Sequence, residues 1–227
     1  MDSKTKNVDD AIKRIREKIA ASCSRSGRSE SEVRLIGATK GIGTESIRYA
    51  VRSGLTDFGE NYIQEAMGKI EGFHEDVCWH MIGHIQTNKA KHISKLFDYV
   101  HSIDRWELLE MLDRYGKRLK VLFELNLAGE ASKHGTGEEN LKRMLERMGE
   151  LKYIEPVGLM TMPPFTENPE DIRGIFRRLK TLLESVNREF SLHMSELSMG
   201  MSSDFEVAVE EGATMVRIGT AIFGERT

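Results

Sequence analysis

The chain of 227 residues has only 4 prolines and 2 cysteines, so it offers few points at which proline interrupts the chain or a disulfide closes it. Cys23 and Cys78 lie far apart and lack C-x-x-C or Cys/His ligand spacing, which argues against a disulfide framework and a zinc-finger type of metal site. No apolar run approaches the ~20 residues of a membrane span, and the charged first residues lack the apolar core of a signal peptide. We therefore expect a cytoplasmic protein.

Neither sign of charge dominates, because the sequence has 33 Lys and Arg residues and 36 Asp and Glu residues, which gives a formal net charge of −3. Such a balanced, slightly acidic surface does not suit a general binder of nucleic acid or of membrane surfaces. The sequence also lacks a Gly/Ser-rich or low-complexity linker. We expect a single domain over residues 1–227, long enough to bury a sizeable core without cross-links.

Short apolar runs alternate with longer amphipathic stretches along the whole chain. The runs predict strands over 33–39, 57–59, 78–82, 99–103, 120–127, 154–160, 193–198 and 214–218. The amphipathic stretches predict helices over 8–21, 44–53, 62–71, 87–95, 105–115, 138–151, 169–189 and 204–210. This alternation predicts an α/β fold, a single (β/α)8 TIM-type barrel with an extra N-terminal helix. An open doubly wound sheet is the main alternative, although no G-x-G-x-x-G follows the first strand.

In such a barrel, functional side chains gather at the carboxyl ends of the strands. The strand ends carry Lys40, Glu60, Asn61, His84, Asp104, Asn126, Met160 to Met162, Ser198 to Ser202 and Arg217 to Thr220. Lys40 ends the run LIGATK, so its stem leaves the barrel wall partly desolvated. Desolvation disfavours the ammonium form and favours an amine that can form an imine with an aldehyde. The alternative is a lysine whose ammonium simply extends into water.

Two glycine-containing turns follow the last two predicted strands, where barrels of this type often bind phosphate. Gly200, Ser202, Gly219 and Thr220 could surround a phosphate dianion, because glycine permits close backbone approach and a hydroxyl adds a donor. The alternative is a pair of ordinary turns with capping serines. The methionines near these strand ends are more typical of core filling than of a designed pocket.

Arg217 and His84 are the remaining candidates from the strand ends. Arg217 lies inside an apolar strand, and a buried guanidinium needs either a carboxylate or a ligand atom. If it faced a pyridine nitrogen, that nitrogen would stay unprotonated and the ring would be a weaker electron sink. His84 could be a base, a ligand contact or a packed residue.

Six tracts of the chain resemble the pyridoxal 5′-phosphate (PLP) homeostasis protein family, whose fold is that of the N-terminal domain of alanine racemase. The resemblance covers about residues 33–223. The tracts are GATK (37–40), DFGENYIQEA (57–66), WHMIGHIQTNK (79–89), GEASKHG (129–135), GLMTM (158–162) and LSMGMSSDFEVAVEEGATMVRIGTAIFG (197–224). One departure is that Gly41-Ile42-Gly43 follows Lys40 where family members have a continuation such as SKTKP, which suggests a more flexible first loop.

The resemblance implies that PLP is the cofactor and that Lys40 carries it as a Schiff base. It implies that Arg217 faces the pyridine nitrogen, and that Lys133 takes part in PLP transfer or in a second binding mode. The phosphate would be surrounded by Ser198, Gly200, Met201, Ser202, Gly219 and Thr220, and the pocket would be lined by Asn61, His84 and Met162.

The resemblance further implies a role in PLP homeostasis, with PLP-dependent apoenzymes as recipients. A racemase needs a second base on the other face of the cofactor. In alanine racemase that base comes from a C-terminal β domain, and this chain ends at Thr227. We therefore expect buffering or delivery of PLP by a monomer without robust catalysis. A weak or partner-dependent racemase and a Schiff-base lyase acting on a sugar phosphate are the alternatives.

Overall fold

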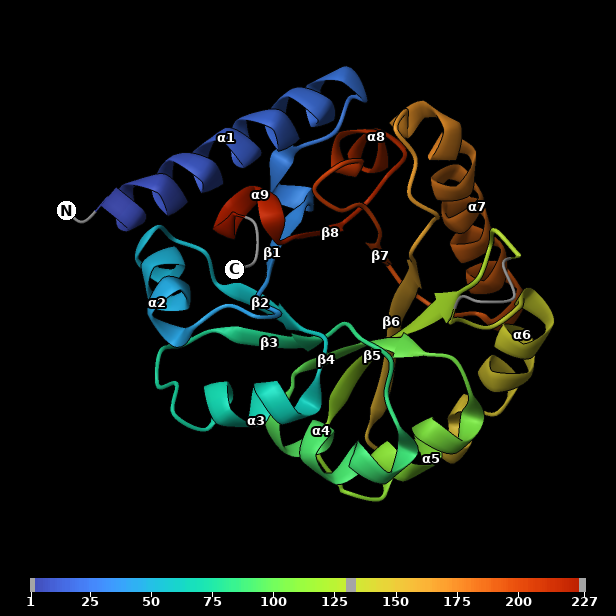
Figure 1. Ribbon diagram of the computed structural model, residues 1–227. Helices are drawn as coiled ribbons and strands as arrows, with labels where there is room; N and C mark the ends of the chain where they lie inside the picture. Colours follow the sequence, from blue (N-terminus) through green and yellow to red (C-terminus); the bar gives the residue numbers. More distant parts are fainter. Residues whose placement is uncertain (1–2, 130–133, 225–227) are drawn as a thin grey trace.

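The computed structural model describes residues 3–129 and 134–224, and these residues form a closed barrel of eight parallel strands (Figure 1). Each strand pairs with the next one in the sequence, and β8 pairs with β1 to close the barrel. The (β/α)8 prediction is thereby confirmed, and the open doubly wound alternative is wrong. The strands are β1 (Arg34–Ala38), β2 (Asp57–Glu60), β3 (Cys78–Met81), β4 (Tyr99–Ile103), β5 (Leu119–Leu125), β6 (Ile154–Thr161), β7 (Glu196–Ser198) and β8 (Met215–Ile218).

An outer ring of helices surrounds the barrel (Figure 1). The helices are α1 (Ser3–Arg25), α2 (Thr44–Arg52), α3 (Ile63–Ile70), α4 (Ala90–Leu96), α5 (Trp106–Asp113), α6 (Glu138–Glu146), α7 (Arg173–Phe190), α8 (Phe205–Glu210) and α9 (Thr220–Phe223). The extra N-terminal helix is α1, which packs across α2, α8 and α9. Among the described residues, no helix combines the length and apolar character needed to cross a membrane.

Three of the predicted helices are shared between an α-helix and a short 3-10 segment. The segments are η2 (Thr87–Lys89) before α4, η3 (Met148–Glu150) after α6 and η4 (Pro169–Ile172) before α7; a further one, η1 (Glu30–Glu32), precedes β1. Pro169 starts η4 at a position where its missing N–H costs nothing, and the side chain of Asn168 caps the segment by accepting from the Glu170 N–H. Two of these segments, η2 and η4, lead from a strand into the next helix, and η3 leads from α6 towards β6.

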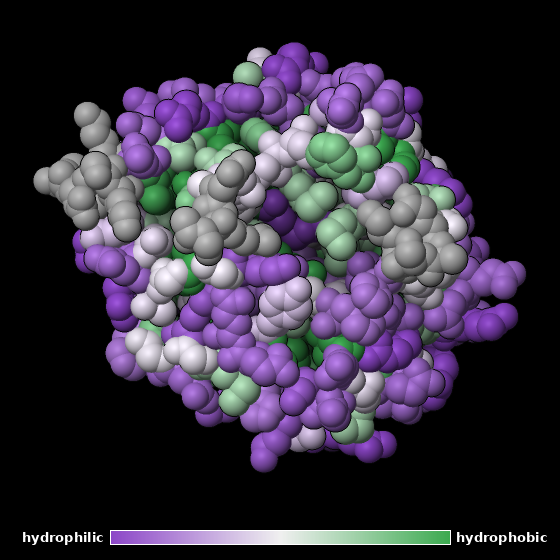
Figure 2. All heavy atoms as spheres, in the orientation of Figure 1, coloured by the Kyte–Doolittle hydropathy of each residue, from purple (hydrophilic) through white to green (hydrophobic). Residues whose placement is uncertain are grey.

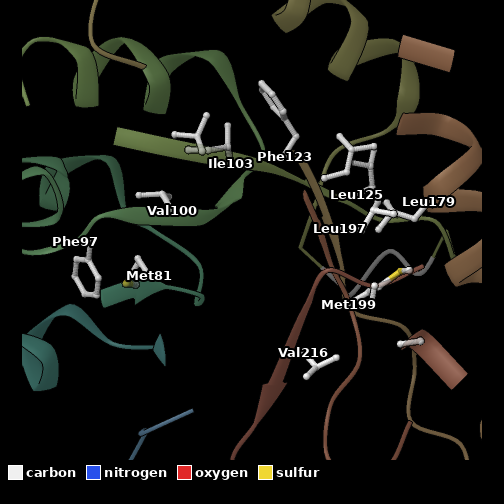
Figure 3. Close-up of a cluster of buried hydrophobic side chains, with 14 of the residues drawn as sticks. Met81, Phe97, Val100, Ile103, Phe123, Leu125, Leu179, Leu197, Met199 and Val216 are labelled. Atoms are coloured by element: carbon white, nitrogen blue, oxygen red, sulfur yellow. The ribbon is translucent and has the colours of Figure 1, made fainter. Parts of the chain in front are cut away.

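The apolar side chains form two separate cores because successive side chains of a strand point to opposite faces. The outer core fills the space between strands and helices, where Figure 3 shows Phe123, Leu197 and Val216 of the strands with Leu179 of α7. Burying a large apolar side chain contributes about 1.5–3 kcal/mol. The inner core lies inside the barrel and consists of Ile36, Tyr99, Leu122, Met160 and Met215.

Above and below this inner core, the same alternation turns polar side chains into the barrel. His101 and Arg217 lie two residues beyond the inner-core residues Tyr99 and Met215, and both are buried. Glu60 does not join them. It contacts Lys69 of α3 and so lies between β2 and the helix layer, which corrects its expected place at the mouth of the barrel.

Candidate functional site

Lys40 lies two residues after the end of β1 and reaches the carboxyl end of the barrel as a partly exposed side chain. Its Nζ donates a hydrogen bond of 3.0 Å to the hydroxyl of Tyr62 and lies 4.7 Å from the centre of that ring. Tyr62, which follows β2, is itself 51% exposed. The amine is thus held at the mouth of the barrel by a neighbouring hydroxyl and is accessible from solvent.

The turn after Lys40 is fixed by hydrogen bonds, although its glycines suggested flexibility. Gly41 has a φ of 74°, a left-handed conformation that favours glycine. Its N–H donates 2.6 Å to Oε1 of Glu65, and the Ile42 N–H donates 2.9 Å to the Thr39 carbonyl. Burial alone would raise the pKa of Glu65, but the hydrogen bonds from Lys69 and Gly41 outweigh it and lower that pKa. An ionised carboxylate therefore anchors the turn.

Behind this turn, Lys69 of α3 lies at the centre of a buried ionic cluster. Its Nζ is 2.7 Å from Oε1 of Glu60, 2.7 Å from Oε1 of Glu65 and 2.5 Å from the Thr39 carbonyl. The Thr39 hydroxyl also donates 2.6 Å to Glu60. Burial raises the pKa of Glu60 despite Lys69 and Thr39. The cluster connects β1, β2 and α3 immediately beneath Lys40.

A cavity of ≈410 Å³ opens at the same end of the barrel. It is lined by three of the predicted site residues, Asn61, His84 and Met162, and by Tyr62, which contacts Lys40. On the face viewed in Figure 2, hydrophilic atoms are recessed near the centre. Met162 is 43% exposed, whereas Met160 and Met199 are core residues, as their type suggested.

Glycine is required where the chain leaves β3 beside this cavity. A Cβ on Gly83 would lie 2.2 Å from the Asn61 carbonyl oxygen, so only a glycine permits the two backbone segments to approach so closely. The adjacent His84 lies 3.5 Å from Asp104 and stacks on His134 with ring centres 4.0 Å apart. Burial and His134 lower the pKa of His84, although Asp104 opposes them. His84 is thus a neutral ring at the edge of the cavity.

The two glycine turns lie side by side. Gly200 has a φ of 94°, and a Cβ there would lie 2.7 Å from the Cβ of Ala208, so glycine permits α8 to pack against the turn. The Ala221 N–H at the start of α9 donates 3.4 Å to the hydroxyl of Ser202. The structure therefore brings together the turns after β7 and β8 that contain Gly200, Met201, Ser202, Gly219 and Thr220.

Arg217 is 5% exposed and has no carboxylate within ion-pair distance among the described residues. One guanidinium nitrogen donates 2.5 Å to the Ser198 hydroxyl and another donates 3.1 Å to the Thr161 carbonyl. Burial lowers the pKa of Arg217 to about 10, although the charges of Glu124 and Asp204 oppose that shift. The guanidinium therefore stays charged at neutral pH.

Four further residues of the site were not singled out from the sequence. They are His80, His101, Glu124 and Tyr62. The two histidines are buried inside the barrel and bond to each other. Glu124 and Tyr62 line the cavity at its mouth. The first three are polar residues inside otherwise apolar strands, the same signal that identified Arg217. Lys133, which the resemblance linked to PLP transfer, lies outside the described residues.

Glu124 predicts a measurable pH dependence of stability. Burial and the charge of Asp104 raise its pKa to about 7, with Arg217 opposing. The folded chain then holds this proton more tightly than the unfolded chain, so its contribution is favourable at low pH and is lost as pH rises towards 7. The free energy of unfolding of Glu124→Gln, taken relative to that of wild type, should rise by about 2–3 kcal/mol as the pH is raised from 5 to 8. Urea unfolding at both pH values tests this, and an equal effect at both would contradict it.

Comparison with known proteins shows which family of barrels this chain belongs to. The chain belongs to the alanine racemase N-terminal domain family, which matches residues 12–227. It is 44% identical over 225 residues to the pyridoxal phosphate homeostasis protein of Aquifex aeolicus, a match that covers 97% of this chain and 99% of the relative. The protein of the same name from Pseudomonas aeruginosa is 39% identical over 231 residues, covering 100% of this chain and 97% of the relative.

Solved structures agree with these matches. PipY of Synechococcus elongatus, whose structure has PLP bound, superimposes with a TM-score of 0.82 at 34% identity and covers 92% of this chain and 100% of PipY. An alanine racemase of Clostridium difficile gives a TM-score of 0.75 at 12% identity, with 97% of this chain and 57% of the racemase covered. The second likeness concerns the fold alone. The resemblance seen in the sequence tracts is confirmed.

Proposed function

We propose that this chain binds PLP as a Schiff base on Lys40 and serves PLP homeostasis by buffering or delivering the cofactor. The observation that carries the proposal is the convergence, at one end of the barrel, of an accessible amine, a buried guanidinium and two adjacent glycine turns. Relatives named pyridoxal phosphate homeostasis proteins and the PLP-bound structure of PipY support it. When bound, PLP supplies an aldehyde for the imine and a ring that can stabilise negative charge.

The residues of the site fit the parts of this cofactor. Lys40 would supply the amine, with the Tyr62 hydroxyl as its hydrogen-bond partner. The turns with Gly200, Met201, Ser202, Gly219 and Thr220 would hold the phosphate. The Ser198 hydroxyl already bonds to Arg217, so we propose that it supports the guanidinium, which would face the pyridine nitrogen. Asn61, His84 and Met162 would border the cofactor.

We further propose that the chain performs no robust catalysis. A guanidinium that stays charged beside the pyridine nitrogen would keep this nitrogen unprotonated and would weaken the ring as an electron sink. The distant alanine racemases share the fold, so a residual racemase activity is the alternative that an assay has to address. The further expectations, of a cytoplasmic monomer that delivers PLP to apoenzymes, belong to the same proposal.

Trapping of the imine tests the proposed function. We expect borohydride reduction of the chain with PLP to attach a pyridoxyl group to the peptide that contains Lys40, as identified by mass spectrometry. The same treatment with a sugar phosphate should leave that peptide unmodified. An adduct with the sugar phosphate would favour the lyase, and turnover of D- or L-amino acids by the pure protein would favour the racemase.

A further inference from the structure

A series of buried hydrogen bonds, here called the relay, crosses the interior of the barrel from its amino-terminal end to Arg217. Asp57, the first residue of β2, lies 3.0 Å from Nε2 of His80, and Nδ1 of His80 lies 2.9 Å from Nε2 of His101. Nδ1 of His101 lies 2.8 Å from the Ser198 hydroxyl, which accepts the bond from Arg217. His80, His101 and Ser198 are each 0% exposed.

The ionised carboxylate of Asp57 determines which atoms donate and which accept along the relay. Burial would raise the pKa of Asp57, but the bonds from His80 and Thr56 and the charge of Arg34 outweigh it and lower that pKa. The carboxylate is then ionised and can only accept hydrogen bonds. His80 must therefore place its proton on Nε2, towards Asp57.

The remaining protons follow in sequence. Burial lowers the pKa of His80, although Asp57 opposes it, and burial lowers that of His101 further, with the charges of His80, Arg217 and Arg34 adding to the shift. A neutral imidazole has one donor and one acceptor nitrogen. His80 accepts at Nδ1, so His101 must donate from Nε2 and accept at Nδ1. The Ser198 proton then points to His101, and the lone pairs of its oxygen remain for Arg217.

We propose that Asp57, His80 and His101 are positioning residues that hold Ser198 as a hydrogen-bond acceptor and thereby fix the guanidinium of Arg217 in the cofactor site. Because the role of Arg217 belongs to the proposed function, this relay rests on that function. The tilt of His80 is fixed as well, since its ring stacks on Tyr99 with centres 4.6 Å apart at 15°. Asp57 borders a cavity of ≈590 Å³ at the amino-terminal end of the barrel, so the relay links the two ends.

A metal ion is the other use that this set of side chains suggests. Asp57, Cys78 and His80 have ligand atoms within 4.8 Å of one another. However, burial and the charges of Asp57 and Asp98 raise the pKa of Cys78 to about 12, so the thiol stays protonated. Arg34 also lies 3.6 Å from the Asp57 carboxylate. The positive charge of the Arg34 guanidinium disfavours a cation at this place and leaves the hydrogen-bonded relay intact.

The tautomers of the two histidines test the relay without any cofactor. We expect nitrogen NMR of the full chain, labelled with ¹⁵N-histidine, to show His80 and His101 both protonated at Nε2 and bare at Nδ1. Asp57→Asn replaces the obligate acceptor by an amide that can also donate, and should give mixed tautomers. Asp98→Asn is the matched control, because Asp98 accepts from the Trp79 N–H on the same end of the barrel. A wild-type histidine protonated at Nδ1, or unchanged signals in Asp57→Asn, would overturn the relay.

The effect of the relay on PLP affinity is measured in a second experiment. We expect Asp57→Asn to weaken PLP binding by about three- to tenfold, the size of one misdirected hydrogen bond, and Asp98→Asn to leave it within about twofold. In a Ser198→Ala background, which cuts the relay, Asp57→Asn should add nothing further. Additive effects of the two changes would overturn the coupling. If wild type fails to bind PLP while the tautomers are as expected, the proposed function fails and the relay stands as a structural feature.

Discussion

Lys40→Ala is expected to abolish the visible absorption band that PLP gives with the wild-type chain. Borohydride should then fix no pyridoxyl group on the protein, because an imine requires the amine that the substitution removes. The Lys40 Nζ bonds to Tyr62 at the carboxyl end of the barrel, and β1 pairs with β8, which precedes one of the two glycine turns. The loss should therefore be large, on the order of 100-fold in PLP affinity, where each factor of ten corresponds to about 1.4 kcal/mol.

A lysine at the same end of the barrel provides the control. Lys89 lines the cavity that contains Asn61 and His84, so Lys89→Ala changes the charge near the mouth without removing the imine amine. The spectrum of this variant should match that of wild type. A band that persists in Lys40→Ala would assign the imine to another amine. A colourless wild type would move the sugar-phosphate lyase to the front.

The barrel could be predicted because its signals are local and repeated. Apolar runs of strand length alternate with amphipathic stretches, and this pattern specifies a parallel sheet without any knowledge of contacts. The ends of the helices were harder to place, since the 3-10 segments beside α4, α6 and α7 keep the helical pattern while the hydrogen bonding changes. The short α9 was missed because four residues carry no periodicity.

The candidate site was predictable where one residue breaks an apolar run, as Arg217 and Lys40 do. His80 and His101 carry the same signal inside β3 and β4, but a histidine within a strand is as typical of a packed residue as of a functional one, whereas His84 lies at a strand end. Glu60 was misplaced because β2 is only 4 residues long, too short for its inner and outer faces to be distinguished by pattern. The contact of Lys40 with Tyr62 joins two loops, and no periodic pattern predicts loop conformation.

The buried ion pair of Lys69 and Glu60 supports the turn that carries Lys40. Lys69→Met should destabilise the chain by about 3–5 kcal/mol, the usual cost of leaving one partner of a buried ion pair uncompensated. The side chain of Lys69 is 10% exposed and that of Glu60 is 0% exposed. The charge on Glu60 would have no cation to balance it, and Oε2 of this carboxylate already lacks a hydrogen-bond partner within the described part of the chain. Urea unfolding at neutral pH measures the loss.

The same variant separates the ionic effect from packing. Without Lys69, Glu60 can avoid the buried charge by holding a proton, so the destabilisation should be smaller at pH 5 than at pH 8. Glu60→Gln in the Lys69→Met background should restore part of the stability, whereas Lys95→Met, at a pair exposed by 71% and 51%, should cost less than about 1 kcal/mol. A loss that is independent of pH and unrelieved by Glu60→Gln would instead assign the role of Lys69 to its apolar stem. Because Lys69 and Glu65 also hold Thr39 and Gly41, the ionic cluster fixes the turn from which Lys40 presents its amine.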